Sequence, residues 1–330
     1  MRVMKLLLQC TVAIAMTVPE WAFAQRSPAE GFPSRPVTMV YPFASGGPGD
    51  NEFRLYADRL LANLGQPFVV DFKPGAAATI GIAYVLKAAP DGYTLLAPNA
   101  GITVIPNFYP AFNENVIKSL VPVTQFSKSY TGVLVSQAVL PKVQSLQDLL
   151  DYAKANPGGL NCNTAGAGGI THTVCVALAT AMNIKITPVH YKGVAQGQID
   201  LIGGRTQVSG GTLFAAMPNI KSGKLRVIAI LGQDRSPLMP EIRTSHEQGY
   251  NVEFPVWQGA FAPPGTPQPI IEKLSAEFGK VVRMPEVIRQ LEMLGNAPVA
   301  STPALFRAKV ASELAYWKKI IMENDIKAEN

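Results

Sequence analysis

Apolar and polar residues follow one another in blocks along the first hundred residues, in the order expected for a parallel α/β sheet. An apolar run over 37–43 predicts a buried strand, and the apolar spacing over 51–64 predicts an amphipathic helix that ends at Gly65. The same alternation predicts a strand at 67–72, a helix at 80–89 and a strand at 93–97. In such sheets, ligands bind at the carboxyl ends of the strands.

A second block of the same kind occupies the middle of the chain. It predicts strands at 132–135, 160–164, 186–191 and 225–231, and helices at 145–156, 171–182 and 194–201. Proline-rich residues 251–267 are expected to be extended, before two amphipathic helices at 269–282 and 302–323. We therefore predict two α/β lobes joined by crossing strands. Lobe 1 comprises residues 25–125 and 250–330, and lobe 2 comprises residues 126–249.

Residues 1–24 have the pattern of a secretory signal peptide. Two basic residues precede an apolar run over 6–18, and Ala22-Phe23-Ala24 offers a small-x-small cleavage site. A lipid anchor at Cys10 is disfavoured, because Gln9 precedes it and apolar residues continue past it. No later stretch has the roughly 18 uncharged apolar residues of a membrane span. We therefore expect an exported, soluble mature chain.

The charge pattern argues against nucleic acid as a partner. The formal net charge is +6, and removal of the signal peptide would lower it to +5. The basic residues are scattered, without a Lys/Arg run or a basic helix with interleaved aromatic residues. A mild positive balance suits an anionic small molecule that arrives by diffusion.

Two glycine-rich turns, at 42–50 and 73–79, each separate a predicted strand from a predicted helix. Small residues let the backbone approach a ligand closely. The first N–H groups of the following helix, together with its dipole, favour negative charge. These turns predict a site for a carboxylate.

Enzymatic motifs are weak by comparison. A nucleophile pair could be built from His172 and Cys175, but no Asn or Asp orients it and the cysteine has apolar neighbours. The sequence has no GxSxG, HExxH, GxxxxGK[ST] or metal-ligand spacing, so we predict no metal and no cofactor. The alternative to a binding protein is a secreted α/β enzyme that acts on a carboxylate substrate.

Seven motifs, in order along the chain, resemble those of the tripartite tricarboxylate transporter solute receptors, also called the Bug family. They are Pro42-Phe43-x-x-Gly46-Gly47-x-x-Asp50, Ala89-Pro90-Asp91-Gly92-Tyr93-Thr94-Leu95-Leu96, Gly166-x-Gly168-x-x-x-His172, Tyr191-Lys192-Gly193, Gly223-Lys224-Leu225-Arg226, Arg235-Ser236 and Trp257-x-Gly259-x-x-x-Pro263-x-Gly265-Thr266-Pro267. The resemblance implies a periplasmic type II binding-protein fold that closes on a small carboxylate and delivers it to a membrane permease. We expect a monomer.

The resemblance also implies which loops hold the ligand. In that family, backbone groups and ordered water of the first and fourth glycine-rich loops hold one carboxylate. Carried over to this chain, the candidate ligand-binding residues are Phe43, Ala44, Ser45, Gly46, Gly47 and Asp50, then Ala78, Thr79 and Asn99, then Thr164, Gly166, Gly168, Gly169 and His172, and finally Gly211.

Their expected roles differ. Ser45 can donate its hydroxyl, whereas Asp50 is interpreted as a helix N-cap because an acid beside a bound anion repels it. Phe43 either packs on the ligand or belongs to the core. A structural hydrogen bond is favoured over ligand binding for His172, and a hinge or core position over ligand stacking for Trp257.

Three departures from the family pattern bear on the ligand. Alanines replace glycines in the second loop, and Gly169 stands where relatives commonly have serine. Residues 209–212 read Ser-Gly-Gly-Thr where many relatives carry an aromatic residue and an aspartate. Without that aspartate an ammonium group has no partner, so we predict a bulkier di- or tricarboxylate, aromatic ones included, rather than an amino acid.

Cys162 and Cys175 flank the fourth glycine-rich loop and are the cysteines that remain after processing. An oxidising compartment permits a bridge. A disulfide requires the two Cα atoms to lie within about 7 Å of each other. This is hard to achieve here, because one cysteine is predicted on a strand and the other about one turn into a helix. We therefore predict two reduced, packed thiols, with a disulfide as the alternative.

Overall fold

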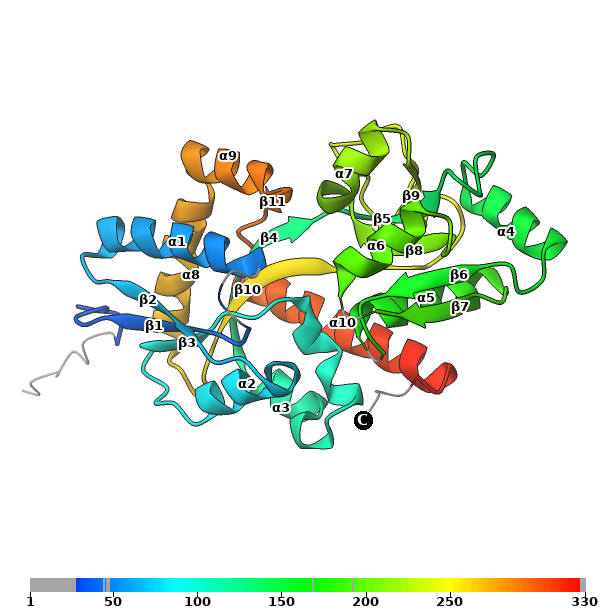
Figure 1. Ribbon diagram of the computed structural model, residues 1–330. Helices are drawn as coiled ribbons and strands as arrows, with labels where there is room; N and C mark the ends of the chain where they lie inside the picture. Colours follow the sequence, from blue (N-terminus) through cyan, green and yellow to red (C-terminus); the bar gives the residue numbers. More distant parts are fainter. Residues whose placement is uncertain (1–27, 44, 46–47, 168, 192, 327–330) are drawn as a thin grey trace, which may run out of the picture.

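Two mixed sheets, each flanked by helices, lie side by side in the computed structural model (Figure 1). The structure describes residues 28–43, 45, 48–167, 169–191 and 193–326, so the predicted signal peptide lies outside the described residues. The first sheet has the strand order β11-β4-β10-β3-β1-β2, and the second has the order β7-β6-β8-β5-β9. The predicted two-lobed α/β fold is confirmed.

The strands of the first sheet are β1 (Val37–Tyr41), β2 (Phe68–Phe72), β3 (Thr94–Leu96), β4 (Val121–Ser129), β10 (Val256–Ala262) and β11 (Asn296–Pro298). Those of the second are β5 (Thr131–Ser136), β6 (Asn161–Thr164), β7 (Thr187–His190), β8 (Val208–Thr212) and β9 (Leu225–Ile230). Strand β1 is parallel to β2 and β3, and β6 is parallel to β7 and β8, whereas β10 and β5 are antiparallel to their neighbours.

The helices that accompany the first sheet are α1 (Pro48–Leu64), α2 (Thr79–Leu86), α3 (Glu114–Ser119), α8 (Gln268–Val282) and α9 (Pro285–Met293). Those of the second sheet are α4 (Leu146–Ala155), α5 (Ile170–Met182), α6 (Val194–Ile202) and α7 (Leu213–Lys221). Short 3-10 helices are η1 (Ala76–Ala78), η2 (Ala100–Thr103), η3 (Ile105–Asn107) and η4 (Pro110–Phe112), and the long helix α10 (Pro303–Glu323) follows β11.

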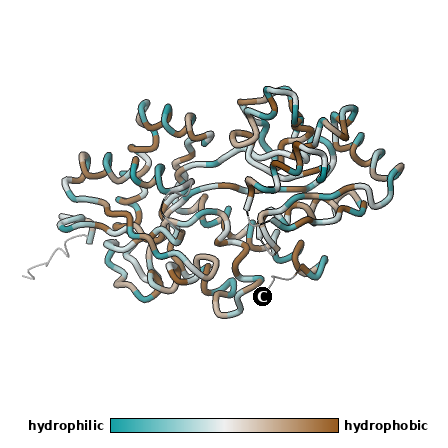
Figure 2. The backbone as a smooth tube through the Cα atoms, in the orientation of Figure 1, coloured by the Kyte–Doolittle hydropathy of each residue, from teal (hydrophilic) through white to brown (hydrophobic). Residues whose placement is uncertain are grey.

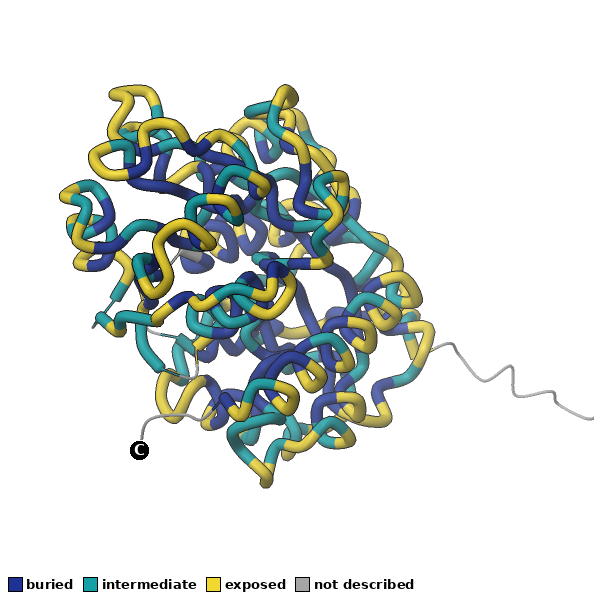
Figure 3. Tube along the Cα trace, turned by 90° about the vertical axis from the view of Figure 1, so that its right-hand side faces the viewer, coloured by how far each residue is buried: buried dark blue, intermediate teal, exposed yellow. Residues whose placement is uncertain are grey.

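Helix α1 shows how the apolar spacing produces a packed layer. Its residues Phe53, Tyr56 and Leu60 recur at intervals of three or four, so they share one face, and all are fully buried. They pack with Phe126 of β4 and Phe278 of α8 in one core. Outer helices alternate hydrophilic and hydrophobic residues along their turns (Figure 2), and buried residues gather inside each lobe (Figure 3).

The chain crosses between the sheets at two places. Strand β4 ends at Ser129 in the first sheet and β5 begins at Thr131 in the second, while the return path leads from β9 to β10. Helix α10 also spans both lobes, because Phe306 lies in a core of the first sheet and Trp317 in the main core of the second. The boundaries at residues 125 and 250 stay a prediction.

A buried carboxyl group in the first lobe gives the fold a pH dependence. Glu52 of α1 is fully buried, and it accepts hydrogen bonds from Tyr56 Oη at 2.5 Å and Asn296 Nδ2 at 2.9 Å. Burial raises the pKa of Glu52 to about 6, although hydrogen bonds from Ser127, Tyr56 and Asn296 pull it down.

The free energy of unfolding is therefore expected to fall by about 2 kcal/mol relative to Glu52→Gln as pH rises from well below 4.5 to well above 6, with most of the fall between these two values. In that window the unfolded chain has released this proton while the folded protein still holds it, so rising pH favours unfolding. Urea unfolding of wild type and Glu52→Gln at several pH values measures the difference. Parallel pH profiles for the two proteins would contradict the raised pKa.

Candidate functional site

A cavity of about 300 Å³ lies between the two lobes, where loops from both sheets meet. From the first lobe it is lined by Phe43 after β1, by Ala77 and Ala78 after β2, and by residues between Asn99 and Tyr109 after β3. From the second lobe it is lined by Ala167, Gly169 and Ile170 after β6. The cavity therefore lies at the carboxyl ends of parallel strands, as the sequence predicts.

The predicted ligand residues divide into three groups. Phe43, Ala78, Asn99 and Gly169 line the cavity. Ser45, Asp50, Thr79, Thr164, Gly166, His172 and Gly211 are described but are not among its lining residues. Ala44, Gly46, Gly47 and Gly168 lie outside the described residues.

The sequence analysis did not single out the segment from Val104 to Tyr109, which supplies Val104, Ile105, Phe108 and Tyr109 to the cavity. The helix and strand periods used to read the sequence leave this segment unassigned, because it forms the short 3-10 helix η3. Phe43 lines the cavity and its ring lies 5.3 Å from the ring of Tyr41, so its position agrees with either of the two roles expected for it.

Two helix N-termini open onto the cavity without a capping side chain. Ala78 is the N-cap of α2 and Gly169 is the N-cap of α5, and neither cap makes a side-chain hydrogen bond. The η2 turn is capped differently, because Asn99 Oδ1 accepts from the N–H of Gly101 at 2.9 Å. At α2 the N–H groups of Ala78 and Thr79 already donate to the carbonyls of Gly75 and Ala76, so this end favours negative charge in the cavity through its dipole. The end of α5 adds the N–H groups of its first turn to the dipole.

The sequence interpretation of Asp50 as an N-cap is wrong. Helix α1 begins at Pro48, so Asp50 lies inside its first turn, where it is buried. Its carboxylate accepts from Ser45 Oγ at 2.9 Å and from Arg54 Nε at 2.6 Å. The hydroxyl of Ser45 is thus already used within the protein, and a bound ligand would have to compete with Asp50 for it.

A buried amide lies beside the same turn of α1. Gln258 of β10 is 7% exposed, and among the described residues its Oε1 has no hydrogen-bond partner. A methyl group added to Gly49 would lie 3.1 Å from that oxygen, and the backbone of Gln258 forms a bridge with Asn99 of the cavity wall. An unpaired buried polar atom is costly, so Gln258 is a candidate to bind or orient a ligand.

The second loop reaches the cavity through a left-handed backbone. Ala76, Ala77 and Ala78 have φ angles of 44°, 51° and 78°, and Thr79 Oγ1 closes the turn by donating to the carbonyl of Ala76 at 2.7 Å. A side chain disfavours this region of φ. The three alanines thus adopt, under strain, a backbone conformation that glycine adopts freely.

Ala77→Gly is expected to leave the free energy of unfolding unchanged or to raise it by up to about 1 kcal/mol, because it relieves this strain. Ala276→Gly is the matched control, in an exposed position within α8 where glycine should cost about 1 kcal/mol. Chemical denaturation compares the two variants with wild type. Equal losses in both would contradict a strained second loop.

On the second lobe, Cys162 of β6 and Cys175 of α5 form a disulfide, with their Cα atoms 6.1 Å apart. The prediction of two reduced thiols is wrong, because the buried face of α5 packs onto β6 and brings the two residues within bridging distance. The bridge closes the chain across residues 165–169, next to the cavity. It also removes Cys175 as a nucleophile for the pair with His172.

His172 and Thr164 belong to a cluster that sequence reasoning missed in part. Thr164 Oγ1 is hydrogen-bonded to His190 Nδ1 at 2.7 Å, and the ring of His172 lies edge-on to that of His190, with their centroids 4.7 Å apart. Nearby, Thr171 Oγ1 accepts from the N–H of Ala165 at 2.9 Å. These contacts hold the fourth loop in place, and they agree with the structural role expected for His172.

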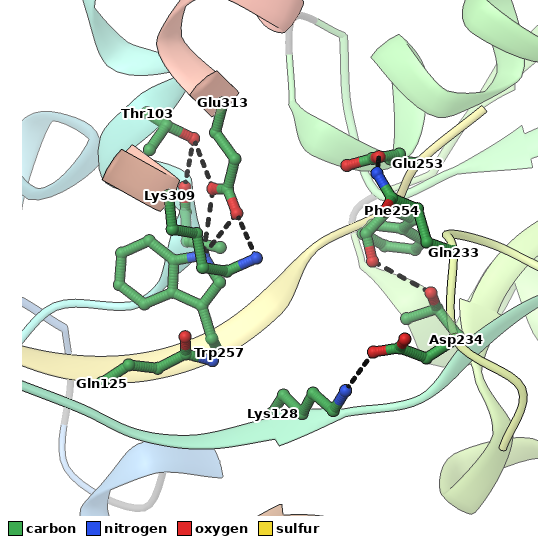
Figure 4. A network of polar contacts seen from close by, with 12 residues as sticks. Thr103, Gln125, Lys128, Gln233, Asp234, Glu253, Phe254, Trp257, Lys309 and Glu313 are labelled. Atoms are coloured by element: carbon green, nitrogen blue, oxygen red, sulfur yellow. Dashed lines mark hydrogen bonds and ion pairs between the residues drawn. The ribbon is translucent and has the colours of Figure 1, made fainter. Parts of the chain in front are cut away.

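Polar side chains brace the strands that cross between the lobes (Figure 4). Trp257 is buried, and its Nε1 donates to both carboxylate oxygens of Glu313 at 3.0 Å, as expected for a core or hinge position. Lys309 pairs with the same carboxylate at 2.9 Å. Burial raises the pKa of Glu313, which the charge of Lys309 opposes. Lys128 of β4 pairs with Asp234 after β9 at 2.7 Å, so this ion pair connects the two sheets.

Among the described residues, no group of three or more His, Cys, Asp or Glu side chains is arranged to hold a metal ion. None of the described helices combines the length and the apolar character needed to cross a bilayer.

Comparison with known proteins places the fold and the cavity in context. Residues 52–326 match the family model of the tripartite tricarboxylate transporter family receptor. The chain is 33% identical over 322 residues to the UPF0065 protein in the tcbD-tcbE intergenic region of Pseudomonas sp. (strain P51), covering 96% of this chain and 94% of that protein. It is 33% identical over 303 residues to protein BugT of Bordetella pertussis, covering 91% of this chain and 92% of that protein.

Solved structures agree with these matches. An R. palustris protein with adipate superposes with a TM-score of 0.73 at 29% identity, covering 90% of this chain and 100% of that one. MatC from Rhodopseudomonas palustris with bound malate superposes with a TM-score of 0.69 at 29% identity, covering 88% of this chain and 100% of that one.

Proposed function

Because the chain belongs to the tripartite tricarboxylate transporter receptor family, we propose that it binds a small carboxylate between its lobes and delivers it to the permease of such a transporter. It does so as a monomer in the periplasm, after removal of residues 1–24. Related proteins have structures with adipate and malate, which are both carboxylates, and this agrees with the proposal.

The observation that carries the proposal is the pair of uncapped helix N-termini at one cavity. Ala78 and Gly169 come from different lobes, so an anion between them would contact both. Helix dipoles attract a carboxylate at each end. A ligand held by both lobes also favours their approach, which is how a two-lobed receptor senses its cargo.

The remaining candidate residues fit this proposal as supporting groups. Ser45 and Asp50 set the geometry of the first turn of α1, and Gln258 offers a buried amide beside it. A half-turn of the amide presents either its oxygen or its NH₂, so Gln258 can accept from a ligand hydroxyl or donate to a carboxylate. Ala44, Gly46, Gly47 and Gly168 belong to the same two glycine-rich loops in sequence.

An enzyme acting on a carboxylate is the competing function. Its nucleophile pair required a free Cys175, and this cysteine is bonded to Cys162. The family match and the bonded state of Cys175 together make the receptor function the better supported of the two.

Mass spectrometry of the purified, denatured protein tests the proposed function. We expect a small carboxylic acid to be released, and to be recovered unchanged after it is added back and incubated with the protein. Release of a neutral or cationic solute, or conversion of the added acid into a product, would contradict the receptor function.

A further inference from the structure

Most of the side chains that line the cavity are apolar. Phe43, Val104, Ile105 and Phe108 line it from the first lobe, and Ile170, the first residue of α5, lines it from the second. Ile105 is 6% exposed and Val104 is 5% exposed, so these side chains are packed into an apolar wall that is largely shielded from water. Such a wall contacts the carbon skeleton of a ligand and offers no hydrogen bonds.

None of the described residues that line the cavity carries a charge. The sequence adds no cation in the gaps of the two loops, since Ala44, Gly46, Gly47 and Gly168 have uncharged side chains. Nearby cations on the same lobe are paired, because Arg54 binds Asp50 at 2.6 Å and Lys73 binds Asp71 at 2.9 Å. Among the described residues, a second carboxylate against the apolar side chains would lose its water and gain neither a cation nor the N–H groups of a helix end, which is strongly unfavourable.

The neutral polar groups of the cavity are few. The hydroxyl of Tyr109 has no hydrogen bond to any described residue, and Asn99 uses its Oδ1 for the backbone of Gly101, which leaves its NH₂ for a ligand. These two groups can satisfy one neutral substituent, such as a hydroxyl, on an otherwise apolar body.

We propose that this receptor selects monocarboxylates with an aromatic or aliphatic apolar body. The single carboxylate lies at the N-termini of α2 and α5, and the body lies between Phe43, Phe108 and Ile170. Aromatic rings fit this wall well, because edge-on contacts with the two phenylalanines add to the area buried. The proposal rests on the proposed carboxylate site and narrows the di- or tricarboxylate expected from the sequence to one charged group.

Ligand pairs that differ only in the far end test this selection. Calorimetric titration would compare benzoate with terephthalate, and hexanoate with adipate, on the wild-type protein. We expect the monoacid of each pair to bind about 100-fold more tightly than the diacid, because the diacid must bury a second, unpaired carboxylate. A diacid that binds as tightly as its monoacid, or more tightly, would overturn the selection and leave the carboxylate receptor standing.

A charge placed in the apolar wall gives an independent readout. Phe108→Arg is expected to reverse the preference toward terephthalate and adipate, whereas Phe108→Leu keeps the wall apolar and should keep the preference for the monoacid. Circular dichroism checks the fold of both variants. If the preference of folded Phe108→Arg equals that of wild type, the proposed position of the ligand body is wrong. If wild type binds neither acid of either pair, nor any other carboxylate in a wider panel, the proposed function itself fails.

Discussion

Replacing Cys162 and Cys175 together by alanine is expected to lower the free energy of unfolding by about 3 kcal/mol. The bridge spans a sequence separation of 13 residues, and closing a loop of about this length in the unfolded chain stabilises a protein by roughly this amount. Both cysteines are 1% exposed in the main core of the second lobe, so the lost sulfur atoms add a small packing defect. Urea unfolding of wild type and the double variant measures the loss.

Thiol counting is the control for this prediction. Denatured, unreduced wild-type protein should show no free thiol at Cys162 or Cys175, and reduction should release both. Two reactive thiols before reduction would contradict the bridge, and a double variant as stable as wild type would contradict its contribution. Because the bridge encloses residues 165–169, we also expect the variant to bind its ligand more weakly at temperatures where it remains folded.

Gly169→Leu is expected to weaken carboxylate binding by roughly 100-fold or more, or about 3 kcal/mol. The backbone at Gly169 has a φ of −77°, which leucine adopts without strain. Among the described residues, a Cβ atom there would have the carbonyl oxygen of Gly166 at 3.6 Å and no other neighbour within 4 Å. The variant should therefore fold, while its side chain takes up space that the ligand needs at the N-terminus of α5.

Gly169→Ser is the matched control for the leucine variant. The serine side chain is small enough to leave the cavity open, and its hydroxyl can donate to the bound carboxylate. We expect the serine variant to bind about as tightly as wild type does. Calorimetric titration of both variants decides the matter. Wild-type affinity in folded Gly169→Leu would show that the ligand lies elsewhere.

The sequence predicts the elements with a clear period and misses those without one. Helix α1 and strands β1 to β3 were found because apolar spacing and terminal glycines agree. Strand β4 was missed, since it begins at Val121-Pro122 and carries polar Thr124, Gln125 and Ser127 that are buried only by the fold. Helix α7 was missed because Pro218 lies inside it.

The site was predicted where backbone chemistry decides it. Of the residues predicted from the loops after strands, Phe43, Ala78, Asn99 and Gly169 line the cavity, and their contact with a ligand stays a prediction. The apolar lining was missed, because a run such as Val104 to Tyr109 has the composition of any core segment until the fold exposes it to a cavity. The disulfide depends on how α5 packs on β6, and the distance between two such residues is not encoded in their spacing.

Binding of matched acids and amides tests the central claim, that the cavity holds a carboxylate, most directly. Thermal unfolding would be followed with benzoate and benzamide, and with hexanoate and hexanamide, at equal concentrations. The account predicts that at least one acid raises the melting temperature, with about 2.7 kcal/mol of stabilisation at 100 times its dissociation constant, and that its amide has little effect. Amides that stabilise the protein as strongly as the acids would contradict it.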